Sequence, residues 1–223
     1  MKKIIEFQEL HRLVPDGIIG IKTLLKMKDV FPIFTDIQLA NFMGQLHHET
    51  AGFSRDTESL NYSVQGLKNT FSFYRRFPNL AWEHGRTWIK KADQKAIANN
   101  VYYDGNRDHK YKLGNTSWGD GWDFRGRGAI MVTGKNNYIE FGKYLGVFLV
   151  NCPEEVATKY YWKSALWYFD TRKLWEIANS INIKSITELT KRINGGLNGL
   201  EDRIKWTKYY YEILQSHSNE IPI

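Results

Sequence analysis

The sequence predicts a mainly α-helical fold with minor β structure. Apolar residues recur at helical spacing in most segments of the chain. Thr35 and Gln38 form a T-x-x-Q capping box, which is a signal for the start of a helix. Residues 129–133, which read AIMVT, suggest a short strand or an extended segment.

The length of 223 residues suits one large domain, or one domain with a small appendage. We expect a short helical N-terminal segment at residues 1–30 and a main domain at residues 31–223. In the first segment, the PDG at 15–17 predicts a turn, and apolar residues recur at near-helical spacing over 21–27. So short a segment holds no core by itself and needs the rest of the chain.

A second helix is expected to begin at the capping box. Its apolar residues recur at i, i+3, i+4 and i+7 from Leu39 to Leu46. Glu49 falls on the same apolar face, near the helix end that Gly52 is expected to impose. A carboxylate at this position is not an ordinary solvated surface charge.

The rest of the chain combines helical patterns with one long loop. Residues 104–128 are dense in Gly, Asp and Asn, and long irregular loops in compact domains are often functional. Residues 160–175 predict a large buried aromatic helix. Further helical patterns lie at residues 63–71, 92–100, 136–146, 185–193 and 200–215.

Composition and charge limit the classes of function. The net charge of +7 favours a polyanionic surface, but no run of five basic residues and no nucleic-acid motif occurs, so we expect no nucleic-acid partner. Aromatic residues make up 15% of the chain and either fill the core or line a ligand cleft, and composition favours the core. With one cysteine, no signal peptide and no apolar run of membrane-spanning length, we expect a soluble protein made in a cytoplasm, without membrane insertion.

The sequence HHE at residues 47–49 has three possible explanations: a metal site, a buried structural cluster or a catalytic acid. Adjacent histidines point about 100° apart on a helix, and no later Cys/His cluster supplies further ligands, so we expect no metal. A structural role would pair Glu49 with an arginine, for example from FRGRG at 124–128. A carboxyl held against an apolar wall also suits a general acid.

A general acid needs a partner, and Glu58 is the candidate. It follows nine residues after Glu49, beyond the glycine break, on what is expected to be a more solvated loop. Two carboxylates in unlike environments are the arrangement that cleaves glycosidic bonds. This pair alone is a weak signal, because the chain has 24 acidic residues.

Four motifs in order make the signal specific: HHETAGF, ESLNYSVQGLKNTF, GDGWDFRGRGAIMVTGKNNYIEFG and RINGGLNGLEDRIKWTKYY. Together they resemble glycoside hydrolase family 19, the plant-type chitinases and related bacteriophage endolysins. The resemblance covers roughly residues 35–215. It implies a lysozyme-like helical domain of two lobes with a deep cleft.

The resemblance also implies catalytic roles. Glu49 matches the general acid of the family, Glu58 matches the base that activates water, and Thr133 matches a residue that helps to hold that water. The implied reaction inverts the anomeric carbon. An inverting enzyme needs about 6.5–9.5 Å between its two carboxyl groups, which is the separation we expect.

Further residues are implied to lie near the sugar chain. Arg203 matches a charged residue on the last helix. Arg125 and Arg127 either contact sugar or form structural salt bridges, and His48 either orients Glu49 or packs against it. The other candidate substrate contacts are Tyr62, Asn137, Tyr138 and Asn194.

Departures from the chitinase pattern favour peptidoglycan as the substrate. Met131 stands where chitinases commonly carry Gln, Cys152 is the one cysteine, and the gap between the two glutamates is short. In addition, residues 15–27 resemble part of a small peptidoglycan-binding module, although a packing role for this segment is equally open.

We therefore expect an inverting endolysin that cleaves β-1,4 bonds between the amino sugars of peptidoglycan. An endochitinase of the same fold and a catalytically inactive wall-binding or virion protein are the alternatives. No cofactor is implied, and we expect a monomer. Without a signal peptide, it would stay in the host cytoplasm until a holin-type membrane lesion gave it access to the wall.

Overall fold

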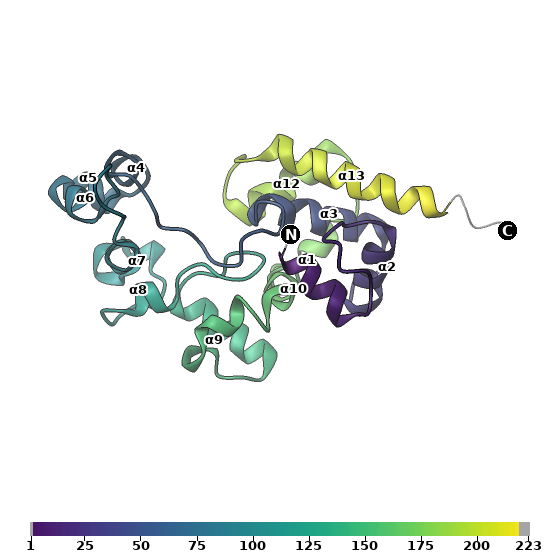
Figure 1. Cartoon of the computed structure of the whole chain (residues 1–223), viewed down its shortest axis with the longest axis horizontal. Coiled ribbons are helices and arrows are strands. Elements are labelled where there is room, and N and C mark those ends of the chain that lie inside the picture. Colours follow the sequence, from purple (N-terminus) through teal and green to yellow (C-terminus); the bar gives the residue numbers. More distant parts are fainter. Residues whose placement is uncertain (1, 219–223) are drawn as a thin grey trace. The chain divides into compact units, whose positions relative to one another are not determined.

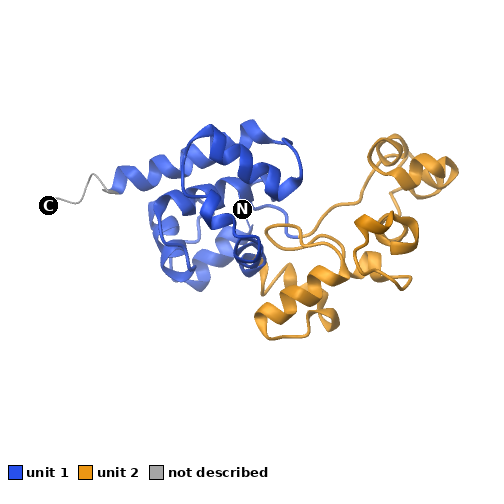
Figure 2. Cartoon of the chain, turned by 180° about the vertical axis from the view of Figure 1, so that it is seen from behind, with its two compact units in different colours: residues 1–56, 162–223 blue, residues 57–161 orange. Residues whose placement is uncertain are grey.

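The computed structural model describes residues 2–218 and is mainly helical, which confirms the predicted fold class (Figure 1). The chain forms two compact units, which are coloured separately in Figure 2. Unit 1 takes in the described part of residues 1–56 and 162–223, and unit 2 is residues 57–161. Unit 1 is therefore assembled from both ends of the chain.

Seven helices belong to unit 1 in the described part of the chain. The helix expected at residues 160–175 is interrupted, because Lys173 adopts a left-handed backbone with φ of 52° and separates α10 from α11. The helices are α1 (Lys2–Leu10), α2 (Ile21–Val30), α3 (Asp36–Glu49), α10 (Tyr161–Thr171, starting at the last residue of unit 2), α11 (Leu174–Ile177), α12 (Ile183–Asn194) and α13 (Leu200–Ser218).

Helix α3 is the buried axis of unit 1. Its predicted capping box is present: the hydroxyl of Thr35 accepts from the N–H of Gln38, and the side chain of Gln38 accepts from the N–H of Thr35. Residues 38–46 are all buried, so the helix is enclosed around its whole circumference rather than on one face. Neighbouring helices therefore determine where its C-terminal end lies.

The closest of these neighbours is α13, which runs alongside α3 (Figure 1). The two backbones meet at Gly44 of α3 and Thr207 of α13. A Cβ atom on Gly44 would lie 2.2 Å from Oγ1 of Thr207 and 2.7 Å from its backbone nitrogen. Only glycine allows so close an approach, and Gly44 thus fixes the spacing of the helix pair.

The N-terminal segment packs into unit 1 through aromatic rings. The ring of Phe7 lies 5.8 Å from that of Phe31, and Phe31 lies 6.3 Å from Phe42 of α3. Its turn is held by Gln8, whose amide donates to Oδ1 of Asp16 at 2.9 Å. Residues 1–30 thus share a unit with the segment that follows them, which agrees with the packing role; wall binding by this segment stays a prediction.

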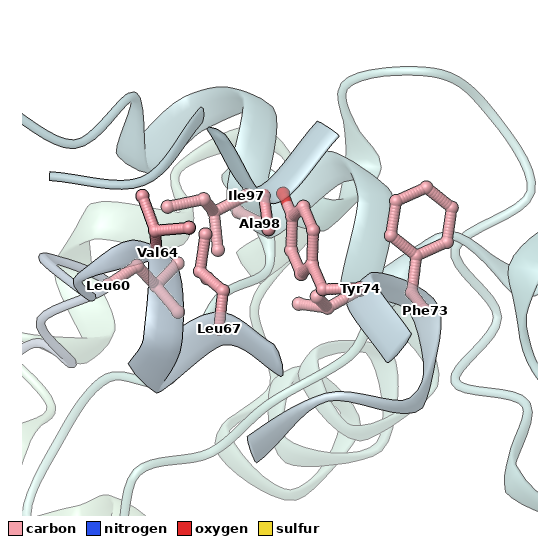
Figure 3. Packing of buried hydrophobic residues seen from close by; sticks show 9 residues of the cluster. Leu60, Val64, Leu67, Phe73, Tyr74, Ile97 and Ala98 are labelled. Carbon is pink, nitrogen blue, oxygen red and sulfur yellow. The ribbon is translucent and has the colours of Figure 1, made fainter. Parts of the chain in front are cut away.

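Unit 2 has its own hydrophobic core, drawn in Figure 3. Leu60, Val64 and Leu67 pack with Tyr74 and Ile97 across three helices of the unit. The helices and 3-10 turns of unit 2 are α4 (Val64–Thr70), α5 (Ser72–Arg76), α6 (Pro78–His84), α7 (Gln94–Tyr102), η1 (Asp104–Asn106), η2 (His109–Tyr111), α8 (Asp120–Asp123), α9 (Lys135–Leu145), η3 (Leu149–Asn151) and η4 (Pro153–Val156).

β structure is limited, in the described residues, to isolated bridges. Arg127 forms antiparallel bridges with Thr57 and with Val132. The segment expected to be extended at 129–133 is therefore a tight turn, with Met131 at a φ of 52°. The expected long loop at 104–128 is present but contains short helical turns.

Across residues 2–218, no helix combines the length and the apolar character that are needed to cross a bilayer.

Substituting Gly44 with alanine tests the helix contact. Alanine would gain about 1 kcal/mol in helix propensity, whereas overpacking against backbone atoms costs about 1–3 kcal/mol or more. Because a Cβ would approach backbone atoms of Thr207 to under 3.0 Å, we expect the clash to dominate and the free energy of unfolding to fall. Urea unfolding and thermal melting measure the change.

The matched control is Gly196→Ala, where the added Cβ meets only Oδ1 of Asn194 at 3.7 Å. Its unfolding free energy should stay within about 0.5 kcal/mol of the wild type. A Gly44→Ala protein as stable as the wild type would show that the close helix contact is not needed.

Candidate active site

The candidate general acid, Glu49, is the last residue of α3 and is followed by a constrained turn. Ala51, Gly52 and Phe53 all have positive φ angles, of 49°, 70° and 59°. Such backbone is costly for residues other than glycine and persists only where the surroundings enforce it. Here the hydroxyl of Thr50 accepts from the N–H of Phe53 at 2.9 Å, and the ring of Phe53 is buried.

Three consecutive side chains at this end of α3 each bind a residue of α13. The HHE sequence therefore joins α3 to α13, and it also contains the candidate acid Glu49. The pairs are His47 with Tyr210, His48 with Asp202, and Glu49 with Arg203.

Glu49 forms an ion pair with a deeply buried guanidinium. Nη2 of Arg203 donates to Oε1 of Glu49, and Nη1 donates to Oε1 of Gln45 at 2.7 Å. Arg203 is 1% exposed and the Glu49 side chain 19%, so the arginine is enclosed and the carboxyl reaches the surface. The arginine partner thus comes from α13, not from the FRGRG segment that the sequence suggested.

This pair fixes one oxygen of Glu49 and leaves the other available. Within residues 2–218, Oε2 of Glu49 has no hydrogen bond. A guanidinium stays charged when buried and needs an anionic partner. Arg203 therefore holds the carboxyl in one orientation, and Glu49 in turn stabilises Arg203.

His48 binds Asp202 of α13. Its Nδ1 lies 2.8 Å from Oδ2 of Asp202, and Nε1 of Trp206 donates to Oδ1 at 3.0 Å. Burial works against the charged carboxylate, but these two hydrogen bonds, together with the electrostatic interactions with His48 and His47, outweigh it and lower the pKa of Asp202. A Cβ on Gly199 would clash with the ring of His48 at 2.0 Å, so the histidine also supports the loop before α13.

His47 is neutral and packed. Its ring stacks on Trp206 with centroids 3.5 Å apart, and Nδ1 lies 2.7 Å from the hydroxyl of Tyr210. Burial lowers the pKa of His47 to about 4, so the ring carries no charge at pH 7. Its role is to hold α3, α13 and the turn at Phe53 together, since its ring also contacts Phe53.

Asn194 is the exposed last residue of α12, and its side chain stabilises the loop that leads to α13. Its amide nitrogen donates to the carbonyl of Asn198 at 2.9 Å, and its Oδ1 accepts from the N–H of Gly196 at 3.0 Å. The carbonyl of Asn198 also accepts from Nε of Arg203 at 3.4 Å. The predicted sugar contact of Asn194 would therefore use a side chain already engaged in its loop.

Tyr168 of α10 is a residue near Glu49 that sequence reasoning missed. Burial raises its pKa, and the charge of Glu49 adds to this effect. Its hydroxyl donates to the carbonyl of Ile193 at 3.2 Å, and the guanidinium of Arg172 stacks 3.7 Å from its ring. The sequence placed Tyr168 in an aromatic core helix, and its spacing carries no sign of another role.

In unit 2, the second candidate carboxylate, Glu58, is held by two donors. The hydroxyl of Tyr102 donates to Oε2 at 2.7 Å, and the N–H of Gly126 donates to Oε1 at 2.6 Å. The N–H of Glu58 donates to the carbonyl of Gly126 at 2.9 Å, so the loop and the carboxylate segment bind each other in both directions. Tyr102 was not anticipated, because nothing in its spacing links it to Glu58.

Thr133 lies beside Glu58. A Cβ on Gly126 would come within 3.2 Å of Oγ1 of Thr133 and 3.3 Å of Cδ of Glu58. The hydroxyl of Thr133 donates to the carbonyl of Met131 at 2.9 Å, and its own carbonyl accepts from the amide of Asn137 at 2.7 Å. Gly126 is therefore packed closely against Thr133 and Glu58, and a side chain on residue 126 would crowd both.

Arg127 and Tyr138 lie beneath this loop rather than on an open surface. Tyr138 is 0% exposed, and its hydroxyl donates to the carbonyl of Arg125 at 2.8 Å. Nη1 of Arg127 donates to the carbonyl of Asp123 at 2.6 Å and to the hydroxyl of Tyr138 at 3.0 Å. Their predicted sugar contacts stay predictions, and this geometry favours a supporting role for both.

Arg125 and Tyr62 are better placed for contact with a ligand. Both side chains are partly exposed, and the guanidinium of Arg125 stacks 3.7 Å from the ring of Trp122. Burial raises the pKa of Tyr62, and the nearby charge of Glu58 raises it further. The unit therefore gathers Glu58, Thr133, Tyr62 and Arg125 in one region.

Across residues 2–218, no group of three or more His, Cys, Asp or Glu side chains is arranged to hold a metal ion. The chemistry available in these two regions is that of carboxyl, hydroxyl and guanidinium groups.

Comparison with known proteins identifies a sequence relative at 41% identity. A protein of Haemophilus influenzae, described as a glycosyl hydrolase family 19 domain-containing protein, is 41% identical over 173 residues. The match covers 76% of this chain and 76% of that protein. No protein-family model matches the chain.

Solved chitinase structures have a similar fold. Chitinase C from Streptomyces griseus superposes with a TM-score of 0.52 at 20% identity, covering 88% of this chain and 83% of that one. A bacterial family 19 chitinase gives a TM-score of 0.51 at 19% identity, with 87% and 84% coverage. At this identity the likeness shows the fold.

Replacing Tyr102 with phenylalanine tests how Glu58 is held. The change removes the hydroxyl that donates to Oε2 and leaves the Gly126 N–H in place. Because hydrogen bonds to charged groups contribute about 1.5–3 kcal/mol, we expect the free energy of unfolding to fall by roughly that amount. Chemical denaturation measures it.

Tyr103→Phe is the control, since within residues 2–218 no hydrogen bond is made by the Tyr103 hydroxyl. It should change stability by less than about 0.5 kcal/mol. Equal effects of the two substitutions would refute the contribution of the Tyr102 bond.

Proposed function

The chain belongs to glycoside hydrolase family 19, and from this premise we propose that it is a bacteriophage endolysin that degrades peptidoglycan. Family membership makes the chain a glycoside hydrolase that acts on a polysaccharide. The proposed bond is the β-1,4 linkage between amino sugars. In this proposal the protein stays in the host cytoplasm until a separate lesion in the membrane gives it access to the cell wall.

Charge supports peptidoglycan over chitin as the substrate. The chain carries a net charge of +7, and peptidoglycan bears carboxylates on its peptides whereas chitin is neutral. Met131 in place of the Gln common in chitinases also separates this chain from that group. An endochitinase remains the alternative, and the fold shared with two bacterial chitinases is the observation that favours it.

In the proposed mechanism, Glu49 protonates the leaving oxygen and Glu58 activates water. Arg203 fixes Oε1 of Glu49, which leaves Oε2 to carry the proton to the substrate. Thr133, beside Glu58, would help to orient the attacking water. Direct attack by water inverts the configuration of the anomeric carbon.

The main support for this proposal is that each of the two carboxylates is oriented by its own hydrogen-bond donors. Arg203 holds Glu49, and Tyr102 with the Gly126 N–H holds Glu58. An inactive wall-binding or virion protein would have no need for two carboxyls oriented in this way. Their orientation therefore favours catalysis over that alternative.

Glu49→Gln tests the acid. The amide oxygen can still accept from Arg203, so we expect a folded protein, although loss of the charge facing a buried guanidinium should lower its stability. General acid catalysis contributes about 10²–10⁴ in rate, and lysis of purified peptidoglycan should fall by that factor. Turbidity loss, normalised to folded protein, measures it.

Glu212→Gln, an exposed change on α13 away from Glu49, is the control and should keep full activity. A purely structural role for Glu49 predicts a lower melting temperature with activity per folded molecule unchanged. That result would remove Glu49 from the mechanism.

Product analysis tests the substrate and the stereochemistry. We expect mass spectrometry to show new reducing-end amino sugars from peptidoglycan at a higher rate than from chitin. Proton NMR should show the α-anomer first, because inversion of a β-linkage gives α. Faster cleavage of chitin would favour the endochitinase, and the β-anomer as first product would exclude inversion.

A further inference from the structure

A protruding loop of unit 2 carries two apolar side chains at its tip. The N–H of Thr87 donates to the carbonyl of Lys90 at 3.0 Å, which closes the loop around Trp88 and Ile89. Trp88 is 95% exposed and Ile89 71%, and among the described large hydrophobic residues Trp88 is the most exposed. Leaving an indole and an aliphatic chain side by side in water is costly unless something covers them.

The base of this loop is anchored to the core of unit 2. The N–H of Asp93 donates to the carbonyl of His84 at 2.8 Å, and Nδ1 of His84 lies 2.9 Å from the hydroxyl of Tyr74. Tyr74 belongs to the hydrophobic cluster of Figure 3. The amine of Lys90 donates to backbone carbonyls at the end of α6, including that of Trp82 at 2.8 Å. These hydrogen bonds hold the loop that carries Trp88 and Ile89 in a fixed position on the core of unit 2.

Positive charges flank the apolar tip. The sequence RTWIKK at 86–91 places Arg86 before the tip and Lys90 and Lys91 after it, with no acidic residue among the six. All three basic side chains are exposed. The apolar pair is therefore flanked in sequence by exposed cations, of which Arg86 and Lys91 lie on either side of it, and this charge complements a negatively charged surface.

We propose that this loop docks the protein onto an anionic phospholipid surface. Trp and aliphatic side chains enter the boundary between headgroups and acyl chains, while Lys and Arg contact the anionic headgroups. A neutral sugar chain such as chitin fits less well, because Ile89 offers no flat face for stacking and cations add little to the binding of neutral sugars. The attachment is peripheral and independent of the hydrolytic site.

Vesicle sedimentation of the full chain tests this inference. The probes are vesicles of phosphatidylcholine alone and of equimolar phosphatidylcholine and phosphatidylglycerol. We expect binding to the anionic vesicles, weakened by salt, and little binding to the neutral ones. Trp88→Ala should lower the partition coefficient about tenfold, given the apolar surface that it removes.

The charge contribution is tested by Arg86→Gln combined with Lys91→Gln. Each cation near an anionic surface contributes about fivefold, so the pair should lower partitioning about 25-fold. Trp118→Ala is the matched control, because Trp118 is also exposed, at 67%, but lies among Gly and Asp residues in SWGDG. It should bind as the wild type does.

Four results would overturn the inference. The first three are no binding to anionic vesicles, equal loss of binding in Trp88→Ala and Trp118→Ala, and binding to neutral vesicles that equals binding to anionic ones. A fourth is Trp88-dependent sedimentation with purified peptidoglycan but not with vesicles, which would make the tip a wall-docking element. Melting curves of each variant show whether it is folded.

Discussion

The contact between α3 and α13 is the constraint on which unit 1 depends. Gly44 lets the two backbones approach until Thr207 lies against α3. Once the helices are this close, three successive side chains at the end of α3 reach partners on α13. The position of the candidate acid is therefore set by helix packing several residues away, and not by the loop that follows it.

The two carboxylates are held by different physical means. Glu49 is oriented by a buried charge, whose own stability requires the pair. Glu58 is oriented by a backbone N–H and a neutral phenol, both supplied by segments that unit 2 holds in place. Beneath that loop, Arg127 and Tyr138 bind backbone carbonyls and so keep Gly126 where it can meet Glu58.

Local features of the fold could be predicted from the sequence, and long-range pairings could not. The capping box at Thr35 and the buried face of Leu39, Phe42, Met43 and Leu46 follow from spacing within a dozen residues, and both are present, whereas burial of the polar side chains between them does not follow from that spacing. Arg203 is 154 residues from Glu49, so periodicity could not identify the pair, and only a motif match placed this arginine near the site. Tyr102 and Tyr168 have no motif and look like ordinary core aromatics.

Because unit 1 is built from both ends of the chain, it can be completed only late in synthesis. Residues 57–161 leave the ribosome as a complete unit, with their own core, before α13 exists. At about 5–20 residues per second, α3 waits roughly ten to thirty seconds for its principal partner. During that time its apolar circumference is exposed to chaperones and to aggregation. Folding during translation should therefore begin in the inserted unit and end with the packing of α13 onto α3.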